Sequence, residues 1–248
     1  MKLLVDLGNS RLKWGLMPAT QLLENTVNSI AWQTQWSQLV QQWQALSCVP
    51  DEVWIASVAS QQLQQKLQQL CQNLWSIKPQ FVETEAQHGL LSNGYQQPQQ
   101  LGVDRWLAMI GAQQQDGDNN LCVVDCGTAV TIDIIEKNQH QGGLILPGLY
   151  SLHPLLIDKT SRVLSPDKPL ALKSGKIVAQ DTQTAVSLGA IRMITATIEH
   201  TIQSFNPLRC FITGGDAATI LPWLSIASEH QPHLVLRGLA NKVNKQCA

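Results

Sequence analysis

The sequence carries one short pattern twice: a run of apolar residues, then Asp, any residue, Gly and a small polar residue. The first copy spans residues 3–10 and contains Asp6, and the second spans residues 121–128 and contains Asp125. Apolar and polar residues alternate after each copy, which indicates a second strand leaving a tight turn. The two Asp residues stand about half of the 248-residue chain apart. The repeat therefore predicts a duplicated domain, with one strand–turn–strand hairpin in each half.

The chemistry of these two turns suits a phosphate group. Gly127 allows the backbone to take positive φ and brings its N–H close to whatever lies in the turn, and Thr128 offers a hydroxyl there. Asp125 would repel a phosphate unless a cation or an ordered water lies between them. Asp and Gly at a hairpin corner are also ordinary turn residues, so one copy alone would carry little weight. Two copies in equivalent places favour a pair of hairpins that hold a nucleotide from both sides.

Composition narrows the class of protein. The hydrophobic fraction of 44% is sufficient for two packed cores. With 17 Lys and Arg against 18 Asp and Glu, the net charge of −1 gives no support for a nucleic-acid surface. We find no apolar run of membrane-spanning length, and Asp6 interrupts the first apolar run before it could serve as a signal peptide. The six cysteines include no Cys-x-x-Cys pair. We therefore expect reduced thiols and a cytoplasmic protein without nucleic-acid or membrane partners.

Residues 1–116 are predicted to form the first domain. Helical spacing of Trp and Leu predicts two helices packed on a sheet, and a polar stretch at residues 85–100 that contains Tyr95 predicts a loop. The strands are expected at residues 2–6, 11–17, within 21–30 and at 52–57, and the helices at 32–46 and 61–74.

Asp104 and Arg105 follow that loop, in the first turn of a helix predicted from Val103, Trp106, Leu107 and Ile110. A carboxylate in this position is favoured by the helix dipole, which is a sufficient structural reason for the Asp. The neighbouring Arg gains nothing from the same field. The pair is therefore a candidate functional site.

Residues 117–248 are predicted to form the second domain. A strand is expected at residues 142–149, a long helix from residue 181 with Asp181 as its N-cap, and a strand at 210–213 before a glycine pair. A short strand at 234–236 and a helix at 238–245 are expected to end the chain, and the polar segment 159–176 is a candidate lid.

Five motifs in this order resemble the type III pantothenate kinase family, of the acetate-and-sugar-kinase/Hsp70/actin superfamily. They are Asp-x-Gly-Asn at residues 6–9, Gly-x-Asp-Arg at 102–105, Asp-x-Gly-Thr-Ala at 125–129, Gly-Gly-x-Ile-x-Pro-Gly at 142–148 and Thr-Gly-Gly-Asp at 213–216. The resemblance covers nearly the whole chain. It implies an α/β protein of two duplicated ribonuclease-H-like domains, with mixed sheets flanked by helices and a cleft between the domains. It also implies ATP-dependent phosphorylation of pantothenate, the first step of coenzyme A biosynthesis, by a homodimer that needs Mg²⁺ and a monovalent cation, K⁺ or NH₄⁺.

The resemblance also assigns roles to matching residues. Asp104 would accept the proton of the substrate hydroxyl, Asp125 would bind the monovalent cation, and Asp6 would hold Mg²⁺ through water. The family more often has Thr where Ser10 stands. Thr182 matches a substrate-binding Thr, although Thr184 remains an alternative for that role. ATP would contact Asp6, Leu7, Gly8, Asn9, Ser10, Arg11, Leu12, Lys13 and Thr128, and pantothenate would contact Tyr95, Gly102, Val103, Asp104, Arg105 and Thr182.

Three other functions fit the sequence less well. Another small-molecule kinase of the same superfamily would share both hairpins, and only the Gly-x-Asp-Arg segment and the Tyr95 loop favour pantothenate. A non-catalytic transcriptional accessory protein is disfavoured by the near-neutral charge and by the presence of Asp6, Asp104 and Asp125. A Rossmann dinucleotide-binding domain is excluded because no Gly-x-Gly-x-x-Gly follows the first strand and opens a helix.

Overall fold

The computed structural model describes residues 1–116, 120–151, 178–205 and 208–246. The chain forms two compact units, one made of Met1–Gly117 with His233–Ala248, and the other of Asp118–Pro232. The sequence analysis placed all of residues 117–248 in the second domain. The two divisions agree near residue 117 but differ at the C-terminal segment, which belongs to the first unit.

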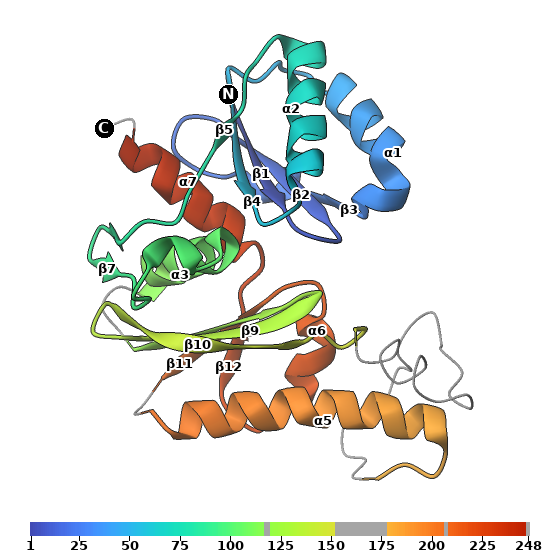
Figure 1. Ribbon diagram of the computed structural model, residues 1–248, viewed down its shortest axis with the longest axis vertical. Helices are drawn as coiled ribbons and strands as arrows, with labels where there is room; N and C mark the ends of the chain where they lie inside the picture. Colours follow the sequence, from blue (N-terminus) through green and yellow to red (C-terminus); the bar gives the residue numbers. More distant parts are fainter. Residues whose placement is uncertain (117–119, 152–177, 206–207, 247–248) are drawn as a thin grey trace. The chain divides into compact units, whose positions relative to one another are not determined.

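The first unit is built on a mixed five-stranded sheet in the order β3-β2-β1-β4-β5 (Figure 1). β1 pairs antiparallel with β2 and parallel with β4, while β3 and β5 extend the two edges. The strands are β1 (Lys2–Leu7), β2 (Leu12–Met17), β3 (Asn28–Ile30), β4 (Glu52–Ser57) and β5 (Gln80–Phe81). The four strands expected from the sequence are thus confirmed.

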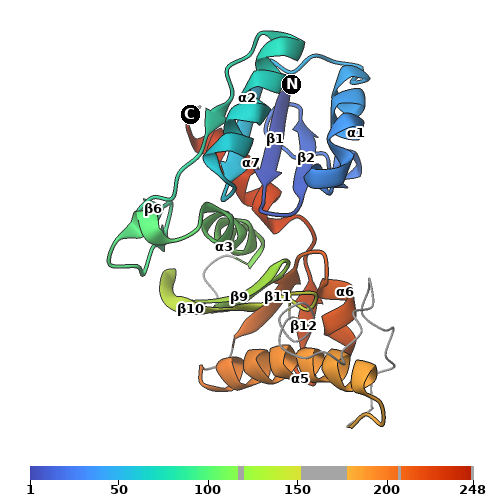
Figure 2. The same cartoon turned by 45° about the vertical axis from the view of Figure 1, so that its right-hand side comes forward.

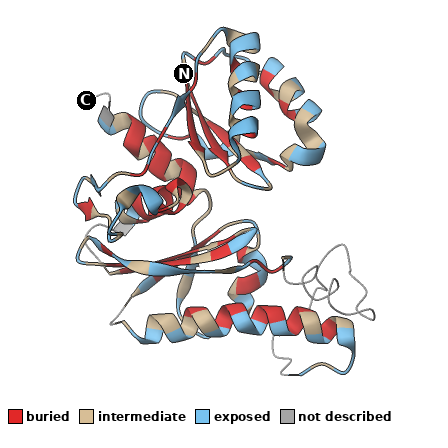
Figure 3. Cartoon of the chain, viewed as in Figure 1, coloured by how far each residue is buried: buried red, intermediate tan, exposed pale blue. Residues whose placement is uncertain are grey.

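Helices α1 (Trp32–Gln44) and α2 (Gln61–Trp75) cover one face of this sheet. Alternate residues of β1, including Leu3 and Val5, pack in one cluster with Trp43 and Leu67 from these helices. The Trp and Leu stripes are therefore core faces, as expected, and the outer faces of the helices are exposed (Figure 3). The hydroxyl of Ser60 caps α2 by accepting a hydrogen bond from the backbone N–H of Leu63 at 3.4 Å.

The opposite face of the sheet is covered by α3 (Val103–Asp116) and α7 (Leu234–Gln246). The two helices cross so closely that a Cβ on Gly238 would overlap the backbone carbonyl of Leu107. A Cβ on Gly111 would overlap the carbonyl of Leu234. This backbone-to-backbone approach attaches the end of the chain to the first unit.

The segment between β5 and α3 contains a short hairpin of β6 (Gln87–His88) and β7 (Leu91–Ser92), followed by the 3₁₀ turn η2 (Pro98–Gln100). Leu91 is fully buried, and the chain passes α7 before it reaches this hairpin beside α3 (Figures 1 and 2). The sequence predicted only a loop here. The 3₁₀ turn η1 (Glu24–Thr26) precedes β3.

The second unit repeats the architecture of the first. Its strands run in the order β12-β11-β8-β9-β10, and α5 (Thr182–Gln203), α6 (Ala217–Ile220) and the 3₁₀ turn η3 (Leu221–Trp223) pack on one face. The strands are β8 (Leu121–Cys126), β9 (Ala129–Glu136), β10 (Gln139–Pro147), β11 (Arg209–Thr213) and β12 (Ser228–His230).

The pairing directions confirm the duplication. β8 is antiparallel to β9 and parallel to β11, as β1 is to β2 and β4. In both units the first three strands form antiparallel pairs and the fourth and fifth extend the sheet in parallel. The prediction of two ribonuclease-H-like domains with mixed sheets and flanking helices is therefore confirmed.

Three details of the second half differ from the sequence-based prediction. Residues 234–236 were expected to form a strand but open α7, which packs on α3 and on the first sheet and fully buries Leu234 and Leu236. β10 begins earlier than expected, since Lys137 and Asn138 both adopt positive φ and make a two-residue hairpin turn after β9. β12 was not predicted. The candidate lid, residues 159–176, lies outside the described residues. Within the described residues, no helix is long and apolar enough to span a membrane.

The α3–α7 crossing generates a stability prediction. Gly238→Ala places a methyl group against the Leu107 carbonyl, so we expect the free energy of unfolding to fall by about 1–3 kcal/mol. Gly189→Ala is the matched control: it lies on the exposed side of α5 with open space around it, and should raise stability by up to about 1 kcal/mol. Urea unfolding followed by circular dichroism measures both. Equal stability of Gly238→Ala and the wild-type protein would contradict the close crossing.

Candidate active site

The first Asp-x-Gly turn joins β1 to β2 and is closed by backbone hydrogen bonds. The N–H of Gly8 donates to the Arg11 carbonyl at 3.0 Å, and the indole Nε1 of Trp32 donates to the Gly8 carbonyl at 3.2 Å. A Cβ on Gly8 would lie 3.2 Å from the same Arg11 oxygen, so glycine suits this turn. Asn9 is exposed at its tip and Ser10 is half-buried. The polar groups expected to contact ATP are thus presented at one end of the hairpin.

Asp6 lies on the face of β1 opposite the α1–α2 core. It is 8% exposed and pairs in register with Lys13 of β2, whose Nζ lies 4.0 Å from Asp6 Oδ2. This is the outer limit of an ion pair, so the carboxylate and the ammonium stand side by side near the turn. An anion and a hydrated cation could both find a partner here.

The second Asp-x-Gly turn joins β8 to β9 and is held against the end of β10. The Thr128 carbonyl accepts hydrogen bonds from the N–H of Gly148 at 3.1 Å and from the Ser151 hydroxyl at 2.7 Å. A Cβ on Gly148 would overlap the Gly127 and Thr128 carbonyls. Thr128 itself is exposed. The proline–glycine turn after β10 therefore fixes the backbone of the second turn and leaves the Thr128 side chain accessible.

Asp125 is half-buried and lies close to the glycine that follows β11. Gly214 has φ +96°, and a Cβ there would overlap both Asp125 Oδ1 and the Cys126 carbonyl. That carbonyl accepts a hydrogen bond from the N–H of Asp216 at 2.9 Å. Thus the Thr-Gly-Gly-Asp motif and the second Asp-x-Gly turn form one local structure. The residue opposite Asp125 in β9 is the uncharged Thr131.

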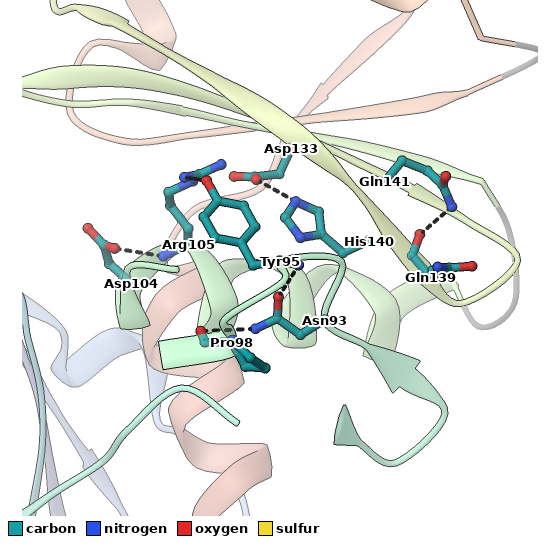
Figure 4. Close-up of polar contacts among 9 residues, drawn as sticks. All are labelled: Asn93, Tyr95, Pro98, Asp104, Arg105, Asp133, Gln139, His140 and Gln141. Atoms are coloured by element: carbon teal, nitrogen blue, oxygen red, sulfur yellow. Dashed lines mark hydrogen bonds and ion pairs between the residues drawn. The ribbon is translucent and has the colours of Figure 1, made fainter. Parts of the chain in front are cut away.

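Asp104 and Arg105 occupy the first turn of α3, as predicted. Asp104 Oδ1 accepts a hydrogen bond from the backbone N–H of Arg105 at 2.8 Å (Figure 4). A Cβ on Gly102 would lie 2.6 Å from this same oxygen, so Gly102 gives the carboxylate its room. Asp104 is half-buried, whereas Arg105 is only 6% exposed. The carboxylate therefore fulfils the structural role expected at a helix N-terminus, and nothing in that role prevents a second one.

Arg105 and Tyr95 form a pair within the first unit. Arg105 Nη1 donates to the Tyr95 hydroxyl at 2.9 Å, and the guanidinium carbon lies 5.7 Å from the centre of the Tyr95 ring (Figure 4). The structure thus brings together the loop and the helix start that the sequence analysis assigned to the same substrate. A buried guanidinium held this way is oriented to bind a carboxylate or a phosphate.

Asn93 organises the loop that carries Tyr95, and the sequence analysis did not identify it. Its side-chain oxygen accepts from the Tyr95 N–H at 2.9 Å, and its amide nitrogen donates to the carbonyls of Glu85 at 3.2 Å and Pro98 at 3.3 Å. The available signal was the Asn-Gly pair at residues 93–94, which marks a turn and gives no hint of the remote partners.

Thr182 is exposed at the first turn of α5, whereas Thr184 is 8% exposed. Asp181 caps the helix, as predicted, by accepting from the Thr184 N–H at 2.8 Å. These positions make Thr182 the more accessible hydroxyl. Its role as a substrate contact stays a prediction.

The two cysteines of β8, Cys122 and Cys126, are buried and have raised pKa values. Burial, and then the nearby Asp125 and Asp216 carboxylates, raise the pKa of Cys126 well above its ordinary value. A hydrogen bond with Cys210, together with burial, does the same to the pKa of Cys122. Thiolate chemistry at neutral pH is therefore excluded for both, and they act as core residues.

A buried Asp–His pair in the second unit was also missed. His140 Nε2 lies 2.9 Å from Asp133 Oδ1, and the two residues are 0% and 2% exposed (Figure 4). They stand on neighbouring strands joined by the two-residue turn, with a bulge between His140 and Gly142. The alternation of apolar and polar residues in β9 predicted that Asp133 lies on the polar face of the strand, where side chains are usually exposed. The sequence therefore did not indicate that Asp133 is buried.

The predicted residues are divided between the two units. The first unit carries the Asp6 hairpin together with Tyr95, Asp104 and Arg105, and the second carries Asp125, Thr128 and Thr182. The described residues contain no group of three or more His, Cys, Asp or Glu side chains placed to bind a metal ion.

Comparison with known proteins gives a consistent result. The family model of type III pantothenate kinase matches residues 2–204. A type III pantothenate kinase of Nitrosococcus oceani is 33% identical over 97% of this chain and 92% of its own length. One of Halorhodospira halophila is also 33% identical, over 96% of each chain, and one of Acinetobacter baylyi is 32% identical over 99% and 98%.

Solved structures show the same fold at lower identity. A protein of Campylobacter jejuni, named as a Baf family transcriptional activator, is 21% identical, with a TM-score of 0.64 over 99% of this chain and 98% of its own. The ROK hexokinase of Thermus thermophilus is 10% identical, with a TM-score of 0.51 over 99% of both chains. These two likenesses show the fold alone.

Proposed function

Since this chain belongs to the type III pantothenate kinase family, its reaction is the ATP-dependent phosphorylation of pantothenate in coenzyme A biosynthesis, and we propose how its residues divide the work. The proposal rests chiefly on one arrangement at the start of α3. There a half-buried carboxylate, Asp104, precedes a buried guanidinium, Arg105, that is held by Tyr95.

Asp104 accepts the proton of the substrate hydroxyl. Phosphoryl transfer proceeds through a loose transition state, so positioning and charge neutralisation supply most of the catalysis. The alcohol must still lose its proton as its oxygen bonds to phosphorus. Asp104 keeps one oxygen on the backbone N–H of Arg105, which fixes the orientation of the carboxylate. A carboxylate fixed in this way orients the hydroxyl and receives its proton late in the reaction.

Arg105 binds the carboxylate of pantothenate or the phosphoryl group in transfer. A guanidinium that is only 6% exposed gains most from an anionic partner, because it is poorly solvated. The Tyr95 hydroxyl orients it before substrate arrives. Gly102, Val103 and Thr182 complete the proposed pantothenate contacts.

The first Asp-x-Gly hairpin contacts the phosphates of ATP. Lys13 supplies positive charge beside Asp6, and the proposed contacts continue along the turn, where Asn9 is exposed and Ser10 is half-buried: Leu7, Gly8, Asn9, Ser10, Arg11 and Leu12. Asp6 would hold Mg²⁺ through water, which fits the preference of Mg²⁺ for few carboxylates, several waters and substrate phosphates. Bound Mg²⁺ would neutralise charge on the phosphates. Thr128 contributes its exposed hydroxyl from the second hairpin.

Asp125 binds a monovalent cation, K⁺ or NH₄⁺. The residue opposite Asp125 in β9 is Thr131, whereas the residue opposite Asp6 in β2 is Lys13. The strand register therefore places no lysine directly across from Asp125. A cation beside Asp125 would offset the repulsion between this carboxylate and a nucleotide phosphate.

Two alternatives are less well supported. Another kinase of the superfamily would share the hairpins, but the curated relatives above 30% identity are named as pantothenate kinases. A transcriptional accessory role has only the name of the C. jejuni protein in its favour, at 21% identity. The cytoplasm is the proposed location, because the reaction consumes ATP.

Substitution of Asp104 tests the catalytic assignment. Asp104→Asn keeps the acceptor for the Arg105 N–H but removes the base, so kcat should fall by about 10²–10⁴-fold with little change in ATP affinity. Asp6→Asn is the comparison, because it should instead weaken the use of Mg²⁺-ATP. Release of ADP in a coupled assay with ATP and pantothenate measures both. Near-full kcat in Asp104→Asn would leave Asp104 with only its helix-terminal role.

Exchange of the monovalent cation tests the role of Asp125. Replacement of K⁺ or NH₄⁺ by tetramethylammonium, at equal ionic strength and constant Mg²⁺, should abolish turnover because the bulky ion cannot approach the carboxylate. The same assay provides the measurement. A rate that does not depend on the monovalent cation would remove this role from Asp125.

We also propose that the chain forms a homodimer. Leu144 and Ile145 of β10 are 44% and 65% exposed, and Tyr150, which follows that strand, is 46% exposed. Because successive side chains of a strand point to opposite faces, Leu144 and Ile145 lie on different faces of β10, and the more exposed Ile145 is the one that we expect an interface to bury. Sedimentation should therefore give twice the mass of one chain, and Ile145→Glu should shift it toward the monomer. A fully active monomer at nanomolar concentration would contradict the dimer.

A further inference from the structure

Helix α7 holds the segment before Tyr95 through a group of four polar residues, here named the polar clamp: Glu85, His88, Asn241 and Lys242. Lys242 Nζ lies 2.8 Å from Glu85 Oε1, and His88 Nδ1 lies 2.9 Å from the same oxygen. His88 Nε2 lies 2.8 Å from Asn241 Oδ1. The two residues of α7 and the two of the loop region thus form one continuous network within the first unit.

The polar clamp is more buried than an ordinary surface ion pair. The side chains of Lys242 and His88 are 4% and 9% exposed, and that of Glu85 is 37% exposed. Burial of an ammonium is unfavourable unless an anion compensates it, so Glu85 has a strongly preferred place beside Lys242. Such a pair contributes little net stability compared with apolar packing, but it selects one arrangement of the groups that it joins.

The next turn of α7 also approaches the hairpin, through the end of the flexible Lys245 side chain. Gly89 follows His88 at the tip of the β6–β7 hairpin with φ +60°, and a Cβ there would overlap Lys245 Nζ. At the base of the loop, the Thr84 hydroxyl donates to the Leu101 carbonyl at 2.8 Å. The loop is therefore closed at its base and fixed along one side by α7.

A short chain of hydrogen bonds connects the polar clamp with Tyr95. The carbonyls of Glu85 and Ala86 accept from Asn93, through its side-chain amide at 3.2 Å and its backbone N–H at 2.9 Å. Asn93 in turn accepts from the Tyr95 N–H, and the Tyr95 hydroxyl accepts from Arg105. Glu85 is thus the point where the network from α7 meets the network that orients Tyr95.

We propose that Lys242, acting through Glu85, is a positioning residue for the pantothenate site. It holds the loop so that the Tyr95 hydroxyl meets the Arg105 guanidinium before substrate binds. This role rests on the proposed function, in which Tyr95 and Arg105 contact pantothenate. Without the polar clamp, part of the energy of pantothenate binding must order the loop, so the affinity for this substrate falls.

The expected kinetic signature is selective. Lys242→Met keeps the length and the apolar stem of the side chain but removes the charge, and should raise KM for pantothenate about tenfold. KM for ATP and kcat should stay within about twofold, because the hydrogen bonds named above do not reach the Asp6 hairpin and Asp104 is oriented by the backbone N–H of Arg105 in α3, not by the loop. Lys242→Arg should restore most of the affinity.

Arg237→Gln is the matched control on the same helix. Arg237 pairs with Glu24 at 2.6 Å, so it fixes α7 to the segment before β3, a different part of the first unit. It should leave KM for pantothenate unchanged. Amide hydrogen exchange over residues 86–97, measured without substrates, should be faster in Lys242→Met and unchanged in Arg237→Gln.

The outcomes are distinguishable. A wild-type enzyme that is active, together with a folded Lys242→Met variant whose KM for pantothenate is unchanged, overturns the positioning role. Equal rises in both KM values, or a loss of stability alone, also overturn it and make Lys242 a purely structural residue. If the wild-type protein fails to phosphorylate pantothenate, the proposed function falls, while the exchange measurement still decides whether the clamp orders the loop. If Lys242→Met does not fold, Asn241→Ala removes one partner of the clamp and replaces it in the same assays.

Discussion

The contact of α3 with α7 is the constraint on which the first unit depends. Two glycines, Gly111 and Gly238, allow backbone to approach backbone, which places a helix from the end of the chain beside one from its middle. α3 begins with Asp104 and Arg105, and α7 carries Asn241 and Lys242. The α3–α7 crossing therefore positions both the proposed catalytic carboxylate of Asp104 and the polar clamp. Close backbone packing of this kind leaves little freedom to adjust, so it is a suitable foundation for a binding site.

The sequence predicted most of the fold because the strongest signals are local. Alternation gave the hairpins at Asp6 and Asp125, and helical spacing of Trp and Leu gave α1 and α2. The prediction failed where the partner is distant in sequence. Leu234 and Leu236 form a short apolar run that resembles a strand by itself, and the partners of α7, which are α3 and the first sheet more than a hundred residues earlier, explain why this run is buried as a helix. The same distance explains why local patterns assigned the C-terminal segment to the second domain, whereas the structure groups it with the first unit.

The residues of the candidate site were also predicted only where the signal is local in the sequence. Asp104 was found because a helix start and an unexplained neighbouring Arg can be recognised within a few residues. Asn93, the Asp133–His140 pair and the polar clamp were not found, since each consists of ordinary polar residues whose meaning depends on what they meet. Asn93 lies in an Asn-Gly turn, and Lys242 lies in a helix where a lysine is normally solvated. Burial, which no local pattern encodes, distinguishes them.

The duplicated hairpins show how one motif can acquire two chemistries. The first turn contains residues 8–11, between the paired Leu7 and Leu12, whereas the second contains only residues 127–129, between Cys126 and Val130. This difference of one residue changes what stands opposite the Asp: Lys13 for Asp6, but Thr131 for Asp125. The first carboxylate therefore has a built-in positive neighbour that also suits phosphate, and the strand pairing provides none for the second. The two hairpins thus share one motif but place different side chains opposite its Asp, a lysine in the first unit and a threonine in the second.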